Sequence, residues 1–182
     1  MRGVELRIVD PNGCDLPAGV TGEVLARSPW MFSGYRGRPE ATAAAIIDGW
    51  YHTGDAGTRD KDGNLFLVDR LKDMIVSGGE NIYSAEVERA LMGHPSVVSV
   101  AVVGAPNEKW GERVVAFVVP HPGRPVDVSE LVTHCRAMIA GYKVPKEIHL
   151  IDALPLTATG KVQKAVLRQR LRDDRGSEPK IS

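Results

Sequence analysis

Two runs of β-branched residues limit the possible folds of this chain more than any other feature. They read VVSVAVVGA at residues 97–105 and RVVAFVVP at residues 113–120. Short continuous apolar runs of this composition are typical of buried strands. The segments around them supply the helices that we expect to flank such a sheet.

Two of these segments carry clear helix signals. Residues 84–94 begin with a candidate N-cap, Ser84, have acidic residues in the first turns and end in Gly-His-Pro. Residues 127–139 have helical apolar spacing and begin with a capping box of Asp127 and Glu130. A further strand and a final helix are expected at residues 146–152 and 162–172.

The first 70 residues differ, because short strands alternate there with turn residues. Asp62-Gly63 leads into a strand and is a strong hairpin signal. A short helix that opens at Pro39 is expected over residues 38–46. The strands expected in this half are residues 4–10, 21–28 and 59–70.

The predicted fold class is therefore α+β, in three parts. A β-rich subdomain covers residues 1–70, and a compact α+β domain with a small sheet flanked by helices covers residues 71–172. Residues 173–182 are expected to form a disordered tail, because Gly, Pro and charged residues replace apolar periodicity there.

Composition excludes several classes of function. The 23 basic residues balance 23 acidic ones, so the chain has no net field to draw it to nucleic acid. Its two cysteines, Cys14 and Cys135, form no metal or redox spacing, which suits a reducing cytoplasm, and we expect no structural metal. No apolar run is long enough for a membrane span. The oligomeric state is not indicated.

The segment PLTATGKVQK places Gly160 and Lys161 just before the last predicted helix. A Walker A loop is excluded, because Val162 follows the lysine where Ser or Thr is required and Pro155 replaces the first glycine. A cation is also unfavourable at a helix N-terminus, whose N–H groups attract anions. Two readings remain at this point: a solvated surface charge, or a site for a visiting phosphate or carboxylate.

Two further segments add candidate residues. In DGWYHTGD, the residues Thr53, Gly54 and Asp55 read as a tight turn whose carboxylate can accept hydrogen bonds from both hydroxyls of a ribose. Arg70, with its fork of donors, suits the same nucleotide. The segment at residues 69–88 contains acidic and basic residues followed by a glycine pair. An exposed turn between two domains has the same composition, so this interpretation also remains open.

Together these segments resemble a known superfamily. GWYHTGD, DRLKDMIVSGGENIYSAEVE, GERVVAFVV and PLTATGKVQK are similar, in order and spacing, to the C-terminal motifs of adenylate-forming enzymes. These include acyl-CoA synthetases, luciferases and peptide-synthetase adenylation domains. The resemblance extends to about residue 172, and the wording of DGWYHTGD, DRLKDMI and GYKVPK is most similar to fatty-acid or aryl-acid CoA ligases.

The resemblance implies a role for five residues. The family's catalytic lysine falls on Lys161, its ribose-binding aspartate on Asp55 and its nucleotide-contacting arginine on Arg70. Its hinge residue falls on Lys72, and the glycine that lines the pantetheine tunnel falls on Gly79. By this resemblance residues 1–70 end the large adenylating domain, and residues 71–172 form a mobile C-terminal domain.

The resemblance also implies an activity. The expected function is that of an AMP-forming acid:CoA ligase, with a fatty acid as the favoured substrate and ATP, Mg²⁺ and CoA as its cofactors. The family's phosphate loop and acyl pocket lie in an N-terminal part that this sequence lacks, so we expect ATP and Mg²⁺ to bind mainly there and this chain alone to be inactive. The alternatives are an adenylation domain that loads a carrier protein, and a non-catalytic nucleotide-binding or interaction module.

Four other conspicuous features have structural interpretations. Trp50 and Tyr51 are expected to be packing anchors, and Trp110 to hold a loop onto the sheet. The basic run of Arg168, Arg170, Arg172 and Arg175 is expected to be a solvated helix end.

Overall fold

A computed structural model of the chain describes residues 3–176, and the chain divides into two compact units, Met1–Lys72 and Asp73–Ser182. The division follows Lys72, close to the boundary expected after residue 70. Both units combine strands with helices, so the predicted α+β class is confirmed. None of the helices within the described residues is long and apolar enough to cross a membrane.

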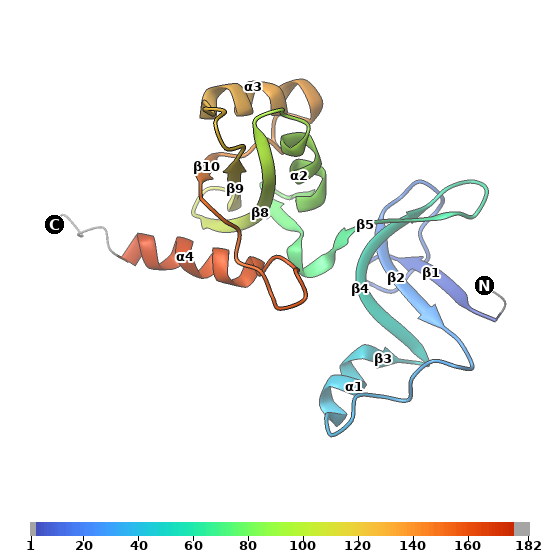
Figure 1. Cartoon of the computed structure of the whole chain (residues 1–182). Coiled ribbons are helices and arrows are strands. Elements are labelled where there is room, and N and C mark those ends of the chain that lie inside the picture. The colour runs from blue at the N-terminus through green and yellow to red at the C-terminus, as the bar shows by residue number, and fades with distance from the viewer. Residues whose placement is uncertain (1–2, 177–182) are drawn as a thin grey trace. The chain divides into compact units, whose positions relative to one another are not determined.

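The first unit is an antiparallel sheet with strand order β1-β2-β4-β3, and β5 pairs with β4 (Figure 1). The three predicted strands and the short helix are present. The elements are β1 (Glu5–Val9), β2 (Gly22–Arg27), α1 (Pro39–Ala45), β3 (Ile46–Ile47), β4 (Trp50–Arg59) and β5 (Leu65–Arg70). The predicted Asp62-Gly63 turn joins β4 to β5 and is closed by Asp60, whose Oδ1 accepts hydrogen bonds from the Asp62 and Asn64 amides at 2.9 and 2.8 Å.

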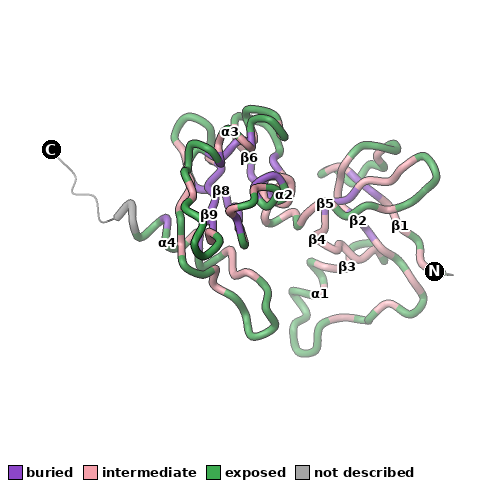
Figure 2. Tube along the Cα trace, turned by 45° about the horizontal axis from the view of Figure 1, so that its top comes forward, coloured by how far each residue is buried: buried purple, intermediate pink, exposed green. Residues whose placement is uncertain are grey.

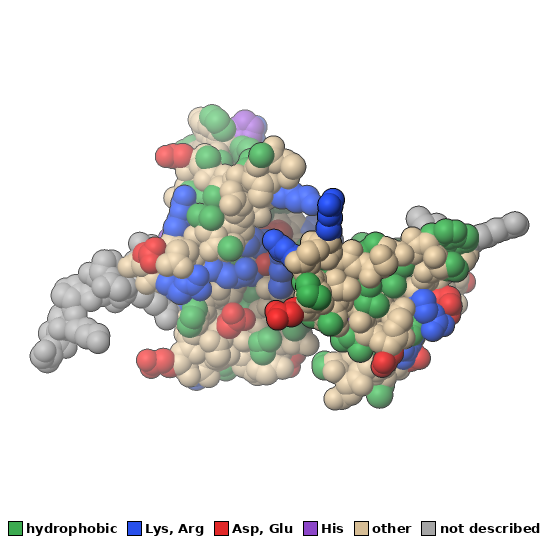
Figure 3. Space-filling model, turned by 90° about the horizontal axis from the view of Figure 1, so that it is seen from below, with side chains coloured by type: hydrophobic (Ala, Val, Ile, Leu, Met, Phe, Trp, Pro, Cys, Tyr) green, Lys and Arg blue, Asp and Glu red, His purple; other side chains and the backbone are tan. Residues whose placement is uncertain are grey.

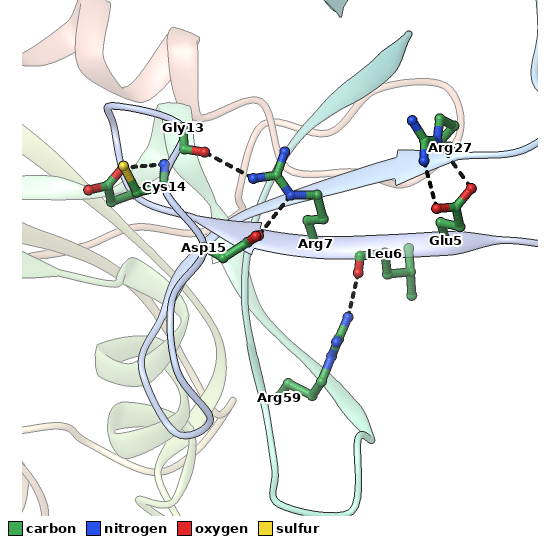
Figure 4. A network of polar contacts seen from close by, with 9 residues as sticks. Glu5, Leu6, Arg7, Gly13, Cys14, Asp15, Arg27 and Arg59 are labelled. Atoms are coloured by element: carbon green, nitrogen blue, oxygen red, sulfur yellow. Dashed lines mark hydrogen bonds and ion pairs between the residues drawn. The ribbon is translucent and has the colours of Figure 1, made fainter. Parts of the chain in front are cut away.

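The core of the first unit is small, and polar contacts along β1 supplement it. Its buried apolar residues are Ile8, Val9, Val24, Leu25 and Ala56. Figure 4 shows Arg7 paired with Asp15 at 2.7 Å, Arg27 paired with Glu5 at 2.7 Å, and Arg59 donating to the Leu6 carbonyl at 2.7 Å. The first two pairs are exposed to solvent, so they contribute little to the stability of the fold.

The second unit is built on the two apolar runs, which form β8 (Val97–Asn107) and β9 (Gly111–Pro120) as predicted. These two strands form a long antiparallel hairpin, and β10 (Glu147–Leu150) pairs with β9 in parallel. A short hairpin of β6 (Ile75–Ser77) and β7 (Glu80–Ile82) joins the start of β9 through Ser77 and Gly111.

Helices cover both faces of this sheet, which explains why the runs in β8 and β9 have no polar alternation (Figure 1). One face packs against α2 (Ser84–Met92) and α3 (Val128–Met138), and the other packs against α4 (Lys164–Gly176). Alternate residues serve the two clusters. The strand residues on the α2/α3 face are Val97, Val100, Val102, Val114, Ala116 and Val118, and those on the α4 face are Ala101, Val103, Ala105, Val115 and Phe117. Figure 2 shows the central parts of both strands buried.

The buried cysteine lies in the larger cluster. Cys135 of α3 is fully buried, and this desolvation raises the pKa of its thiol to about 11. Cys14 is exposed in the first unit. The N-terminus of α3 is capped as predicted by Asp127, whose Oδ1 accepts a hydrogen bond from the Ser129 amide at 2.8 Å.

Three expectations about the second unit are wrong in detail. The N-cap of α2 is Tyr83 instead of Ser84, because Ser84 is the first helical residue and its side chain is completely buried. The last helix begins at Lys164, two residues after the expected start at residue 162, and it continues to Gly176. Residues 173–176 of the expected tail are therefore helical, and the rest of that tail lies outside the described residues.

Candidate functional site

Asp55 lies in a strand bulge and not in the tight turn that its sequence suggests. The pairing of β2 with β4 joins Leu25 to His52 and then Glu23 to Ala56, so Thr53, Gly54 and Asp55 lie opposite Val24 alone. Gly54 has a φ of 69°, a left-handed conformation that glycine adopts without steric cost. The extra residues bend the strand, and bulges of this kind commonly direct a side chain at a functional site.

Side chains from β2 and β4 fix this bulge. The Thr53 hydroxyl donates to the Val24 carbonyl at 2.7 Å and accepts from the Asp55 amide at 3.0 Å. The Gly54 amide donates to Glu23 Oε1 at 3.3 Å, and Glu23 Oε2 lies 3.0 Å from His52 Nδ1. His52 therefore has a partner within the sheet, and its interaction with Glu23 supports the bulge.

The structure brings Asp55 and Arg70 together. They are paired residues of β4 and β5, and Arg70 Nη1 lies 2.9 Å from Asp55 Oδ1. The same nitrogen donates to the Thr53 carbonyl at 3.0 Å. The Asp55 side chain is 28% exposed and that of Arg70 is 54% exposed, so both are accessible. A carboxylate has about four lone-pair positions, and Arg70 occupies only part of this capacity.

Aromatic side chains lie next to this pair along the sequence. Tyr51 contacts Phe32 edge to face at a centroid distance of 5.1 Å. A hydrogen bond with the Tyr35 hydroxyl raises the pKa of Tyr51, and partial desolvation adds to this effect. Trp50 packs under the Arg27 guanidinium, 4.4 Å from the ring centroid. Both contacts agree with the packing role expected for Trp50 and Tyr51.

Lys72 and Gly79 lie on either side of the start of the second unit. Lys72 is exposed in a 3₁₀ turn, η1 (Leu71–Asp73), and is the last residue of the first unit. Gly79 lies in the β6–β7 hairpin, in a segment that the sequence also allowed as a plain exposed turn. Gly78 and Gly79 have φ angles of 61° and 85°, the left-handed pair that a two-residue hairpin requires.

The glycine pair has different surroundings at its two positions. A Cβ on Gly78 would lie 3.0 Å from Cε3 of Trp110, whereas a Cβ on Gly79 would meet no atom within 4 Å. The Gly78 amide also donates a hydrogen bond to the Trp110 carbonyl at 2.8 Å. Trp110 thus holds the hairpin as expected, and Gly79 presents bare backbone at its tip.

Lys161 lies at the end of a second hairpin-like turn, three residues before α4. The Gly160 amide donates to the Thr157 carbonyl at 2.9 Å, and the Thr157 amide donates to the Lys161 carbonyl at 2.8 Å. Gly160 has a φ of 80°, which a residue with a side chain rarely adopts. The Lys161 amide donates to the Thr157 hydroxyl at 3.1 Å, which in turn contacts Thr159 at 3.0 Å. The turn therefore has a defined backbone.

The Lys161 side chain is exposed, and its ammonium has no hydrogen bond or ion pair among the side chains that the structure describes. Nearby basic residues differ from it in this respect. Lys164 pairs with Glu88 at 2.8 Å and Arg168 pairs with Asp73 at 2.8 Å. Lys161 is thus a charge held on a defined turn and accessible to an anion.

The basic run of α4 is only partly the solvated helix end that was expected. Figure 3 shows Lys and Arg side chains gathered on the face of the second unit where Figure 1 places α4. Arg168 is 26% exposed and is held by Asp73, while Arg172 bonds Gln169 on the helix surface at 2.8 Å. Arg170 is exposed as expected, and the side chain of Arg175 lies outside the described residues.

The residues that contact the base of the Lys161 turn were not predicted from the sequence. Gln163 closes its base with a side-chain bond to the Leu156 carbonyl at 2.7 Å. Lys164 anchors the start of α4 to Ser84 and Glu88 of α2. Gln163 and Lys164 are the last two residues of the motif PLTATGKVQK. Their contacts could not be read from it, because helical periodicity alone places Lys164 and Glu88 on exposed helix surfaces.

The site residues are thus divided between the units: Asp55, Arg70 and Lys72 in the first, Gly79 and Lys161 in the second. Gly79 and Lys161 lie on different hairpins, and no hydrogen bond joins them among the described residues. Three of the cavities formed by the described residues, of about 630, 520 and 340 Å³, are lined by other residues.

Known proteins are similar to this chain in sequence and in fold. Residues 86–161 match the family described as AMP-binding enzyme C-terminal domain. A feruloyl-CoA synthase from Amycolatopsis sp is 49% identical over 166 residues, which are 91% of this chain and 34% of the relative. The fatty acid–acyl-carrier-protein ligase ScoC from Streptomyces coeruleorubidus is 44% identical over 172 residues, 94% of this chain and 33% of the relative.

The fold is also similar to that of a solved structure. ATP-bound MatB from Rhodopseudomonas palustris has a TM-score of 0.89 and 36% identity, covering 96% of this chain and 35% of that chain. The chain thus spans about one third of the length of the curated relatives that it matches. It belongs to the adenylate-forming superfamily, and it corresponds to the C-terminal region of these enzymes, with residues 86–161 in the AMP-binding enzyme C-terminal domain.

Proposed function

We propose that this chain is part of an AMP-forming acid:CoA ligase, which activates a carboxylate as acyl-AMP and then transfers the acyl group to CoA. The observation that supports this most is the Lys161 ammonium, which has no partner among the described side chains and lies on a turn whose backbone is fixed by hydrogen bonds. A purely structural lysine at this place would be expected to find a partner, as Lys164 does.

In the first half-reaction the carboxylate attacks the α-phosphate of ATP, and pyrophosphate leaves. Two anions must approach each other, so electrostatic repulsion contributes to the barrier. In this proposal the Lys161 ammonium lies beside both groups and neutralises the charge as the bond forms. A cation that is already in place acts without reorganisation at the moment of reaction, which is the most effective form of electrostatic catalysis.

Asp55 and Arg70 serve the nucleotide in this proposal. The free lone pairs of the Asp55 carboxylate accept the two ribose hydroxyls, while Arg70 holds the carboxylate at 2.9 Å and contacts the nucleotide with its remaining donors. The bulge in β4 directs Asp55 away from regular strand geometry. ATP enters with its Mg²⁺ as substrate, and a polypeptide region that precedes these residues in the relatives binds the phosphates.

The second half-reaction needs a different surface. Once acyl-AMP has formed and pyrophosphate has left, no second anion has to be brought to the phosphate, and Lys161 would obstruct the incoming thiol. Rotation of the second unit about Lys72 would withdraw Lys161 and bring the exposed backbone of Gly79 to the pantetheine path. Gly79 suits that role, because a Cβ there would have no protein contact and would protrude into the path.

The favoured acid is a fatty acid, and an aromatic acid is the second candidate. ScoC is a fatty acid ligase, whereas the feruloyl-CoA synthase acts on an aromatic acid, and both are similar to this chain. ScoC also supports the alternative that the acceptor is a carrier protein instead of CoA. A non-catalytic nucleotide-binding module is less well supported, because such a module has no need of the exposed Lys161 ammonium, which has no partner among the described residues.

The test is pyrophosphate release from ATP with a panel of fatty and aromatic acids. It compares this chain alone with the full-length enzyme that carries it, and CoA with a phosphopantetheinylated carrier protein as acceptor. We expect release only from the full-length enzyme, since positioning of both substrates needs the rest of the active site. Release by this chain alone would contradict its proposed inactivity, and no release by either would favour the binding module.

A further inference from the structure

Lys164 differs from an ordinary helix-surface lysine because it is nearly buried and bound to two groups. Its side chain is 15% exposed, and Nζ donates to the Ser84 hydroxyl at 2.6 Å and lies 2.8 Å from Glu88 Oε1. Ser84 is completely buried. A lysine placed so deeply loses much of its hydration, so it is retained only where both partners are in position.

The partners of Lys164 are themselves fixed. Glu88 Oε1 also accepts the Val102 amide of β8 at 2.9 Å, and Ser84 begins α2. Lys164 therefore ties the first residue of α4 to α2, which packs on the other face of the sheet, and through Glu88 to strand β8. A second pair on the same face of α4, one helical turn later, joins Arg168 to Asp73 at 2.8 Å.

The contacts of Lys164 with Ser84 and Glu88, called the anchor below, are connected to the Lys161 turn through a short and ordered backbone. Val162 forms an isolated bridge with Leu156 and packs against the buried cluster on the α4 face. The Gln163 amide donates to the Pro155 carbonyl at 2.8 Å, and its side chain bonds the Leu156 carbonyl at 2.7 Å. The two segments that lead into and out of the Lys161 turn are thus held together at its base, and Lys164 follows directly in the sequence.

From this geometry we infer that Lys164, bound to Ser84 and Glu88, is a positioning residue that fixes the Lys161 turn for the adenylation step. The inference rests on the proposed function. Its physical basis is that Lys161 has no partner of its own among the described side chains, so the place of its ammonium depends on the backbone beneath it. A displacement of about 1 Å at a catalytic group can reduce a rate by about a hundredfold.

The second unit offers a matched control. Lys143 also binds a glutamate of α2, with Nζ 2.7 Å from both oxygens of Glu86, and its side chain is 19% exposed. It is therefore a lysine–glutamate pair of similar burial on the same helix, but it precedes β10 and is not part of the Lys161 turn. Lys143→Met therefore measures the general effect of losing a lysine–glutamate pair of this kind on the second unit.

The first test is hydrogen exchange in this 182-residue chain. Lys164→Met keeps the length of the side chain but removes both bonds, and we expect the Gly160 and Gln163 amides to exchange at least about tenfold faster. Amides in the centre of β9 serve as the internal reference. Lys143→Met should leave the two turn amides unchanged. Wild-type exchange at these amides in Lys164→Met would overturn the inference.

The second test measures the two half-reactions in the full-length enzyme. We expect Lys164→Met to reduce acyl-AMP formation by about tenfold or more, while thioester formation from supplied acyl-AMP stays within about twofold of the wild type. Lys164→Arg should restore part of the adenylation rate, since the guanidinium can bind the same two oxygens. An unchanged adenylation rate, or equal loss in both half-reactions, would overturn the inference.

Failure of this inference can be told apart from failure of the proposed function. If the wild-type full-length enzyme forms no acyl-AMP, the proposed function is wrong, and if Lys161→Ala leaves adenylation intact, the proposed role of Lys161 is wrong. In both cases the hydrogen-exchange measurement still tests whether Lys164 holds the turn. If Lys161→Ala abolishes adenylation and Lys164→Met does not affect it, only the anchor is wrong. Should Lys164→Met fail to fold, Glu88→Gln gives the same readouts, because it removes the charge and retains an acceptor for Val102.

Discussion

At the scale of single residues, Gly79 has a structural requirement that is separate from its proposed role in the pantetheine path. Its φ of 85° is required by the two-residue hairpin between β6 and β7, whatever the role of its backbone in catalysis. The identity of this glycine is therefore no proof of a pantetheine path. The two contributions must be separated by comparison with its neighbour Gly78.

Alanine substitutions at the two glycines should differ in cost. Gly79→Ala is expected to lower the free energy of unfolding by about 1–2 kcal/mol, the cost of a left-handed conformation. Gly78→Ala should cost more, because its Cβ would lie 3.0 Å from the Trp110 ring. Urea denaturation measures both, and Trp110→Ala should remove the excess. Equal costs at the two positions would contradict this packing.

The stability of the second unit is expected to depend on pH through Glu147, and urea denaturation can test this as well. Burial opposes its ionisation, but hydrogen bonds from Arg113 at 2.9 and 2.7 Å outweigh this and hold the pKa of Glu147 below its usual 4.5. A lowered folded-state pKa contributes stability above the unfolded-state value, and this contribution is lost as the pH falls through the lower folded-state value.

Glu147→Gln should therefore destabilise the second unit at neutral pH, and the difference from the wild type should shrink as the pH falls below 4.5. Urea denaturation at several acidic pH values measures this. A difference in unfolding free energy that stays constant with pH would show that ionisation of Glu147 contributes nothing.

At the scale of elements, α4 links the core of the second unit to the Lys161 turn. Leu167 is fully buried in the cluster with Val103, Val115 and Phe117, whereas Val166 next to it is 36% exposed. The position of Lys161 therefore depends on the docking of a helix that follows it in the sequence. The strength of this docking can be measured independently of any activity.

Leu167→Ala should lower the free energy of unfolding of the second unit by about 2–5 kcal/mol, the usual cost of a large cavity in a core. Val166→Ala is the matched control, with an expected change within about 0.5 kcal/mol. Thermal or urea unfolding followed by circular dichroism gives both values. A similar small effect for the two variants would mean that α4 does not pack as described.

Elements with strong periodicity were predictable from the sequence, and short irregular ones were not. Strands β8 and β9 followed from their β-branched runs, and α3 from its apolar spacing and the Asp127 cap. Strands β6 and β7 have three residues each and lie among charges and glycines, so no periodic signal was available. The bulge at Asp55 depends on pairing with a distant strand, which a local turn signal cannot reveal.

At the scale of the whole molecule, the chain consists of two units that meet at Lys72 in the sequence, with candidate site residues in both. The identity of these residues came from ordered motifs, and the structure added the contacts that hold them. The sequence did not indicate that Ser84 is buried or that Lys164 binds it, because these depend on packing between α2 and α4.

The most direct test of the account is the Lys161→Ala variant of the full-length enzyme, measured in each half-reaction separately. We expect acyl-AMP formation to fall by about a hundredfold or more, as is usual when one preorganised charge donor is removed. Thioester formation from supplied acyl-AMP should remain near the wild-type rate. Equal loss in both half-reactions, or no loss in adenylation, would contradict the proposal that Lys161 serves the first step alone.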